Sequence, residues 1–192
     1  MTQFTRRALI AALAAALPLS AAFAQDIKER SFKLATQNPK GHPIVVGAEK
    51  FAEIVAAKSG NKLQVKIFPG GTLGGDAANV SALQGGTIEM ISLNSGILAS
   101  QVKDFEVFDF PFMFANATEA DAIVDGPFGQ KMHAKLAEKG IVGLGYTELG
   151  VRQLTNGERA VNTVDDIAGL KLRVIPNPIN VDWVKALGAN PT

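Results

Sequence analysis

Arg173 is the side chain of this sequence with the clearest capacity for ligand chemistry. It lies in the stretch 169–175, GLKLRVI, where the leucines and the valine share one strand face and Lys171 and Arg173 share the other. A guanidinium can hold a carboxylate through two parallel hydrogen bonds. The pattern leaves two interpretations open. The alternation by itself favours a solvent-facing strand edge, and the second interpretation is a carboxylate contact inside a binding site.

The residues of common enzyme sites do not occur at their usual spacings. His42 and His133 are far apart in sequence, so no His-x-x-x-His pair supplies zinc ligands. Cysteine is absent, which excludes thiolate catalysis, cysteine metal sites and disulfides. There is no Gly-x-Ser-x-Gly motif, and the glycine-rich loop 69–75 lacks the Lys-Ser/Thr ending of a phosphate-binding loop. We expect no catalytic residue, no metal site and no cofactor; a hydrolase with a triad assembled from distant residues is the weaker alternative.

The first 24 residues predict a cleavable export signal. Arg6 and Arg7 precede an uncharged apolar run at 8–17, and Ala-Phe-Ala at 22–24 has the small-x-small pattern of a signal peptidase site. The run is shorter than the roughly 20 apolar residues that cross a bilayer. The general secretory and twin-arginine routes both fit this signal. We therefore expect a periplasmic protein, cleaved near Ala24.

The charge of the mature chain gives no reason to expect a polyanionic partner. Without Arg6 and Arg7, 17 basic side chains face 18 acidic ones, a net charge of −1. Such a chain has no electrostatic drive toward nucleic acid or anionic lipid. About 168 residues remain after the signal, enough for one domain or two small lobes.

Strand-like and helix-like segments alternate over the first part of the mature chain. We expect strands at 32–36, 62–68, 88–93 and 141–146, and helices at 44–58, 76–84 and 117–139, the last broken at Gly126-Pro127. Asp76 is expected to cap its helix, and the phenylalanine-rich segment 105–114 is expected to pack in the core. Alternation of this kind predicts an α/β lobe with a mainly parallel sheet.

Strand-like and helix-like segments become fewer after Gly150. An extended segment at 151–155, a turn at Asn156-Gly157, a short turn at 165–169, a strand at 170–175 and a helix at 178–187 are expected. Trp183 is expected in the core rather than on a ligand. Two strands and one helix do not form an independent core. We therefore expect a first lobe at 25–149 and the start of a second, truncated lobe at 150–192.

Five segments, in order along the chain, resemble the solute receptors of TRAP transporters, the DctP-type family. They are the strand 32–36 with His42-Pro43 and the following helix, VKIFPGGTLG at 65–74, LQGGTIEM at 83–90, FDFPFMF at 108–114, and GVRQLTN at 150–156 with GLKLRV at 169–174. The last pair is the most specific. Together these segments cover nearly all of the mature chain.

The resemblance implies a periplasmic-binding-protein-like, two-lobed α/β clamshell that is not an enzyme. Its implied partners are a small organic acid, which it binds, and the subunits of a sodium-driven TRAP membrane permease, to which it delivers that acid. A receptor of an ATP-driven transporter and a periplasmic sensor module with a similar clamshell are the alternatives within the binding class.

The resemblance also assigns ligand-binding residues. It implies that Arg173 grips the ligand carboxylate and that Arg152 is a second pocket contact. Gln37, Asn94 and Asn177 match pocket-lining positions. Each of these three follows a predicted strand, at the carboxyl end where open α/β sheets bind ligands. Ordinary turn chemistry is the competing explanation for all three.

Overall fold

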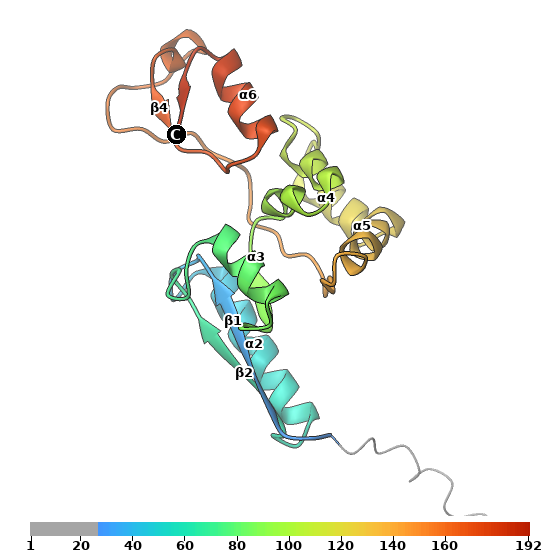
Figure 1. Ribbon diagram of the computed structural model, residues 1–192. Coiled ribbons are helices and arrows are strands. Elements are labelled where there is room, and N and C mark those ends of the chain that lie inside the picture. Colours follow the sequence, from blue (N-terminus) through green and yellow to red (C-terminus); the bar gives the residue numbers. More distant parts are fainter. Residues whose placement is uncertain (1–26) are drawn as a thin grey trace, which may run out of the picture.

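The computed structural model describes residues 27–192, so the predicted export signal at 1–24 lies outside the described residues. A three-stranded sheet and a two-stranded sheet lie at opposite ends of this part of the chain, and helices α4 (Ala117–Val124) and α5 (Pro127–Ala137) lie between them (Figure 1). Within residues 27–192, no helix is both long and apolar enough to cross a membrane.

The first sheet is parallel and has the strand order β2-β1-β3. Its strands are β1 (Arg30–Thr36), β2 (Leu63–Phe68) and β3 (Met90–Ser92). Leu34 on the central strand is in register with Ile67 on one side and Met90 on the other. Because all three strands run the same way, their carboxyl ends meet at one edge of the sheet. Of the ligand-binding residues predicted from the sequence, Gln37 and Asn94 follow strands at this edge.

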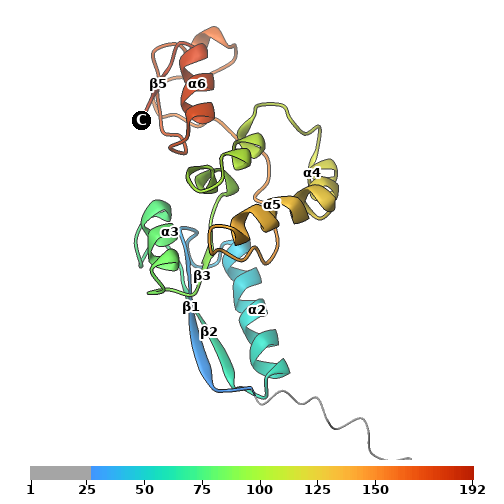
Figure 2. The ribbon, with the colours of Figure 1, turned by 45° about the vertical axis from the view of Figure 1, so that its right-hand side comes forward.

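Helices α2 (Pro43–Lys58) and α3 (Asp76–Gln84) connect these strands and lie on opposite sides of the sheet (Figure 2). The sequence sets both ends of α2. His42 accepts a hydrogen bond from the Ile44 amide at its start, Pro43 occupies the first turn, and Ser59 ends it. Burial of Val45 fixes the face that α2 turns toward the sheet.

The predicted strands 32–36 and 62–68 and the helices 44–58 and 76–84 are confirmed to within two residues. The strand predicted at 88–93 is shorter, with three residues. The prediction that Asp76 caps α3 is wrong. Gly75 holds the cap position in an extended conformation without a side-chain hydrogen bond, and Asp76 is the first helical residue. A carboxylate in the first turn still interacts favourably with the helix dipole.

The middle of the chain is helical and has its own apolar core. It contains the 3₁₀ helices η1 (Ser95–Ser100) and η2 (Lys103–Asp109) and the α-helices α4 (Ala117–Val124) and α5 (Pro127–Ala137). Their buried core consists of Val102, Phe105, Met132, Leu136 and Ile141. The predicted break at Gly126-Pro127 is confirmed.

The phenylalanine-rich segment packs only in part, so the prediction for 105–114 is wrong for its second half. Phe105 is buried, and Phe108 makes aromatic contacts with it and with Tyr146. By contrast, Phe110 is 46% exposed and Phe112 is fully exposed. The helix η2 ends at Asp109, before these exposed residues, and Phe112 has a positive φ of 58°.

The strand predicted at 141–146 is also wrong. The segment has no regular secondary structure and forms no ladder with any strand of the described chain. Only Ile141 is buried, whereas Val142 and Leu144 are 75% and 73% exposed. An apolar, β-prone sequence becomes a strand only where a neighbouring strand accepts its hydrogen bonds.

The C-terminal part contains η3 (Asp165–Ile167), β4 (Lys171–Leu172), α6 (Pro178–Ala186) and β5 (Asn190–Pro191). The helix and its proline start are as predicted, but the strand is shorter than 170–175. The parallel pairing of β4 with β5 was not predicted. A second core, made by Leu170, Leu172, Val184 and Ala189, includes Trp183 at its border, as expected for a core tryptophan.

Candidate functional site

Two of the predicted ligand-binding residues lie at the carboxyl edge of the three-stranded sheet. Gln37 directly follows β1, and Asn94 follows β3 after one intervening residue. The glycine-rich loop 69–75 follows β2 at the same edge. Parallel topology therefore brings these segments together although they are far apart in sequence.

Gln37 fixes the glycine-rich loop. Its Nε2 donates a hydrogen bond to the carbonyl oxygen of Gly74 over 2.6 Å, and Asn79 Nδ2 donates to the same oxygen over 3.2 Å. A Cβ at Gly71 would lie 2.7 Å from Gln37 Oε1, and Gly71 has a φ of +70°. Only glycine suits this position. Gln37 thus holds the loop, while its side chain remains exposed.

Asn94 and Asn177 are helix caps that meet around Gly96. Asn94 Oδ1 accepts a hydrogen bond from the Gly96 amide, which starts η1. Asn177 Oδ1 accepts one from the Asn180 amide, which starts α6. The Nδ2 of Asn177 lies 3.4 Å from the carbonyl oxygen of Gly96 and donates to it. The turn chemistry that competed with the ligand interpretation is therefore present in both residues.

The carboxylate of Asp109, the last residue of η2, lies at the centre of this group. Its side chain is 2% exposed. Asn177 Nδ2 donates to Asp109 Oδ2 over 2.6 Å, and Arg152 Nη2 lies 3.5 Å from Asp109 Oδ1. The Arg152 side chain is half exposed, so the guanidinium pairs with Asp109 on one side and faces solvent on the other. We call Asn94, Gly96, Asp109, Arg152 and Asn177 the Asp109 cluster.

Sequence reasoning missed Asp109. It treated the segment around this residue as packing, although Asp109 is the one acid in the apolar run FDFPFMF. A single charged residue inside an apolar run is the available signal, because a buried charge requires partners. Those partners come from residues 43 and 68 positions further along the chain, which no local pattern identifies.

Arg173 is exposed and directly follows β4, with Lys171 exposed and Leu170 and Leu172 buried as the alternation predicted. Within residues 27–192 its side chain makes no hydrogen bond or ion pair. Its charge acts on Asp76: burial raises the pKa of the Asp76 carboxyl, and Arg173 partly offsets that rise. Arg173 therefore lies close to the start of α3, at the carboxyl edge of the first sheet.

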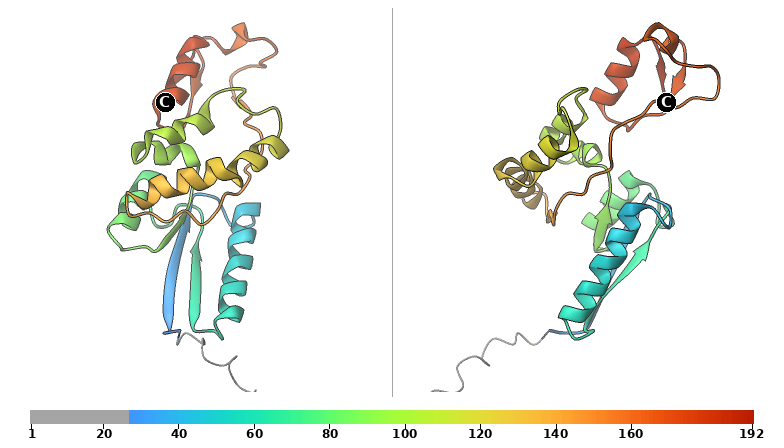
Figure 3. Two further views of the ribbon diagram at one scale, coloured as in Figure 1. Left: turned by 90° about the vertical axis from the view of Figure 1, so that its right-hand side faces the viewer. Right: turned by 180° about the vertical axis from the view of Figure 1, so that it is seen from behind.

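The structure thus divides the five predicted residues into two groups. Asn94, Arg152 and Asn177 belong to the Asp109 cluster. Gln37 and Arg173 lie near the glycine-rich loop and the start of α3. Helix α6 and η2 contact each other, which ties the C-terminal part of the chain to the middle part (Figure 3).

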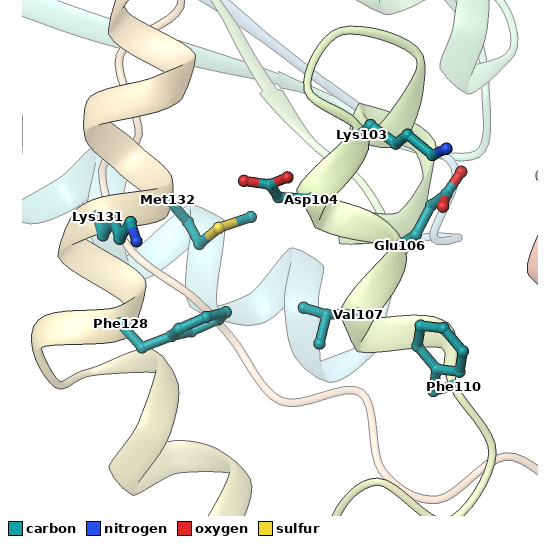
Figure 4. Close-up of a pocket in the computed structure, with 8 residues that line it drawn as sticks. All are labelled: Lys103, Asp104, Glu106, Val107, Phe110, Phe128, Lys131 and Met132. Atoms are coloured by element: carbon teal, nitrogen blue, oxygen red, sulfur yellow. The ribbon is translucent and has the colours of Figure 1, made fainter.

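A separate pocket of about 370 Å³ lies between η2 and α5. Figure 4 shows the apolar side chains of Phe128, Met132 and Val107 near its centre and charged side chains of both signs around them. None of the five predicted residues lines it. Asp104, one of its lining residues, pairs with Lys135.

Both histidines have structural contacts. His42 caps α2, and the ring of His133 stacks on Tyr146 with centroids 4.7 Å apart and planes 6° from parallel. A Cβ at Gly143 would collide with the His133 ring, so the chain passes closely over it.

Replacing Gly96 by alanine is expected to destabilise the Asp109 cluster. A Cβ there would lie 1.6 Å from Asp109 Oδ2 and 3.0 Å from Asn177 Nδ2. We expect G96A to lower the free energy of unfolding by about 1–3 kcal/mol, as other overpacked sites do. Urea unfolding followed by circular dichroism measures this. Gly145→Ala is the control, because nothing lies within 4 Å of its Cβ position; an equal loss in both variants would contradict the prediction.

Replacing Arg173 by methionine is expected to raise the pKa of Asp76 further, because a cation that favours the carboxylate is removed. A carboxyl with a raised pKa stabilises the fold fully below its unfolded-state pKa and loses that contribution as the pH rises through its folded-state pKa. The methionine variant should therefore retain this contribution to a higher pH. Carbon-13 NMR titration of the Asp76 carboxyl is the measurement. The control is Lys171→Met. An unchanged Asp76 titration in R173M would show that Arg173 is not close to Asp76.

Comparison with known proteins places this geometry in a family. The profile described as "Bacterial extracellular solute-binding protein, family 7" (DctP) matches residues 34–192. The 2,3-diketo-L-gulonate-binding periplasmic protein YiaO of Escherichia coli is 36% identical over 146 residues, which are 76% of this chain and 44% of YiaO.

Two solved structures are similar in both sequence and fold. A TRAP periplasmic solute-binding protein from Ochrobactrum anthropi, with a C-terminus bound in its ligand-binding pocket, is 50% identical with a TM-score of 0.76. It is matched over 87% of this chain and 52% of its own. The sugar acid binding protein DctPAm of Advenella mimigardefordensis, in complex with galactonate, is 38% identical with a TM-score of 0.85, over 86% and 54% of the two chains.

The chain spans less than half the length of YiaO and about half that of the two solved chains. Its α/β architecture matches theirs over that span, and the profile match covers nearly all of the described residues. The chain therefore belongs to the DctP family of bacterial extracellular solute-binding proteins, family 7.

Proposed function

We propose that this protein is an extracytoplasmic receptor that captures a small organic acid by its carboxylate and delivers it to a TRAP-type permease. The observation that carries the proposal is that Arg173 is exposed and has unused hydrogen-bond donors. Its guanidinium is exposed and makes no hydrogen bond or ion pair within the described chain, and it lies near the start of α3. A planar guanidinium with open donors is suited to a carboxylate.

The start of α3 adds to this anion preference. Gly75 caps the helix without a side-chain hydrogen bond, so backbone amides of the first turn have no side-chain acceptor there. Asp76 introduces an opposing charge at this place, and Arg173 balances it in part. A carboxylate that binds beside Arg173 gains from both the guanidinium and the helix end.

Arg152 is proposed as the second contact with the ligand. Unlike Arg173, it is already paired with an acidic side chain of the protein. Asp109 holds one side of its guanidinium and leaves the other toward solvent. A guanidinium carries five donors, so it can bind a carboxylate in the protein and a second acceptor in a ligand together. Gln37, Asn94 and Asn177 are proposed as contacts for ligand hydroxyl groups, in addition to the loop and cap contacts that they make.

The ligands named for similar proteins support this substrate class. YiaO is named for 2,3-diketo-L-gulonate, and the DctPAm complex contains galactonate. Both are sugar acids, with one carboxylate and several oxygen groups. The Ochrobactrum anthropi structure holds a C-terminus in the same kind of pocket, and a C-terminus also ends in a carboxylate.

We propose that binding closes two lobes, at 25–149 and from 150 onward, and involves no catalysis. The separate apolar cores of the middle and C-terminal parts support this division, since the first reaches Tyr146 and the second begins with Leu154. We also propose that residues 1–24 direct export to the periplasm and are removed near Ala24. The similar Ochrobactrum anthropi protein and YiaO are both described as periplasmic.

The natural gene product that carries this sequence, taken at its full length, is expected to bind sugar acids. Galactonate at about 100 times its Kd should add about 2.7 kcal/mol to the free energy of unfolding and raise the Tm. Arg173→Ala should weaken binding about 10- to 100-fold, because a charge-assisted contact to the carboxylate is lost. Differential scanning fluorimetry and isothermal titration calorimetry measure the two effects.

Lys171→Ala is the matched control, since it removes an exposed cation two residues away on the same strand face. It should bind galactonate like the parent protein. If no member of a broad panel of carboxylates shifts the Tm of the parent protein, the proposed function is wrong.

Transport is expected to depend on a sodium gradient. Cells that carry the receptor gene and its neighbouring permease genes should take up the labelled acid, and a sodium ionophore should abolish uptake. Uptake that survives the ionophore but stops when ATP is depleted would instead assign the receptor to an ATP-driven transporter.

A further inference from the structure

We propose that Asp109 is a positioning residue that couples Arg152 to helix α6 through a continuous chain of hydrogen bonds ending at Trp183. The ligand-binding part of this proposal rests on the proposed function, whereas the chain of hydrogen bonds does not. Asp109 lies in the phenylalanine-rich segment 105–114, for which the sequence predicts core packing and no ligand-binding residue.

This chain of hydrogen bonds consists of four contacts. The Trp183 indole Nε1 donates to Asn180 Oδ1 over 3.1 Å, and Asn180 Nδ2 donates to Asn177 Oδ1 over 3.1 Å. Asn177 Nδ2 then donates to Asp109 Oδ2 over 2.6 Å. On the far side of the carboxylate, Arg152 Nη2 donates to Asp109 Oδ1 over 3.5 Å.

In each of the four hydrogen bonds the acceptor lies on the side of the Asp109 carboxylate. This common direction has a chemical cause. Indole and guanidinium groups only donate, an ionised carboxylate only accepts, and an amide does both through different atoms. The carboxylate therefore fixes which way the amide of Asn177 points. Asn177 in turn fixes Asn180, which fixes the indole of Trp183.

Burial makes this chain rigid. Asn180 is fully buried, Asn177 is 6% exposed, and the Asp109 side chain is 2% exposed. A buried polar group with an unmatched atom is costly, so the members have few alternative partners. Gly96 closes the remaining space, because even a methyl group there would displace Asp109.

The chain joins parts of the molecule that are otherwise separate in sequence. Asp109 belongs to η2, Arg152 to the segment after Gly150, which has no regular secondary structure, and the three remaining members to the start of α6. An acid that binds the open side of Arg152 contacts the same guanidinium that pairs with Asp109. The resulting change in the Arg152–Asp109 contact reaches the start of α6 through Asn177.

Trp183 allows the chain of hydrogen bonds to be followed by NMR, because it is the sole tryptophan in the sequence and gives a single indole N–H signal. In the protein without ligand, Asp109→Asn should shift the NMR signals of the Asn177 side-chain amide and the Trp183 indole N–H. Glu106→Gln is the matched control on the same 3₁₀ helix, since Glu106 makes no hydrogen bond or ion pair within residues 27–192. Unchanged Asn177 and Trp183 signals in D109N would overturn the proposal.

Asn177→Ser provides a second variant if D109N does not fold. Serine is a good N-cap, so α6 keeps its start, but the amide that donates to Asp109 is lost. The proposal expects both the Trp183 indole and the Arg152 Nε signals to move, because residue 177 lies between them. If neither signal moves, Asn177 does not connect the two residues and the proposal fails.

A binding measurement on the full-length gene product tests the role of Asp109 through Arg152. D109N should weaken galactonate binding about ten-fold or more, whereas the same change in an Arg152→Gln background should weaken it less than two-fold further. Equal losses in both backgrounds would show that Asp109 acts on the fold alone and would overturn the positioning role. If the parent protein binds no member of a broad panel of carboxylates, the proposed function fails, and only the NMR signals of the ligand-free protein then test the chain of hydrogen bonds.

Discussion

The buried carboxylate of Asp109 is the constraint on which the arrangement of the site depends. An ionised group that leaves water must be matched by donors, or burial costs several kcal/mol. Its donors, Asn177 and Arg152, come from segments that are distant in sequence. The requirement to satisfy one charge therefore fixes the end of η2, the segment after Gly150 and the start of α6 relative to one another.

The two arginines differ because their surroundings differ. Arg152 is held by Asp109 and shares its guanidinium between protein and solvent. Arg173 makes no hydrogen bond or ion pair within the described chain, and its charge partly offsets the rise in the pKa of Asp76 that burial causes. Under the proposed function, Arg152 is positioned before an acid binds, and Arg173 keeps its donors open for the carboxylate.

Prediction from sequence succeeded where local patterns carry the information. Helix α2 has its cap at His42, a proline in its first turn and an apolar face, so its bounds could be read from spacing. The same holds for the alternation that exposes Lys171 and Arg173. It failed at 141–146, where the composition is strand-like but no neighbouring strand in the described chain accepts the hydrogen bonds. It failed at Phe112, which is fully exposed and has a positive φ of 58°.

The sequence by itself determined the α/β class, the absence of cysteine chemistry and the polar candidate residues that follow strands, because each depends on residue type and short-range order. Only the tertiary structure decided which candidates meet. It grouped Asn94, Arg152 and Asn177 around Asp109 and put Gln37 and Arg173 near the glycine-rich loop. The physical reason is that a buried charge chooses its partners by distance in space, and the contacts to Asp109 span 43 and 68 residues of chain.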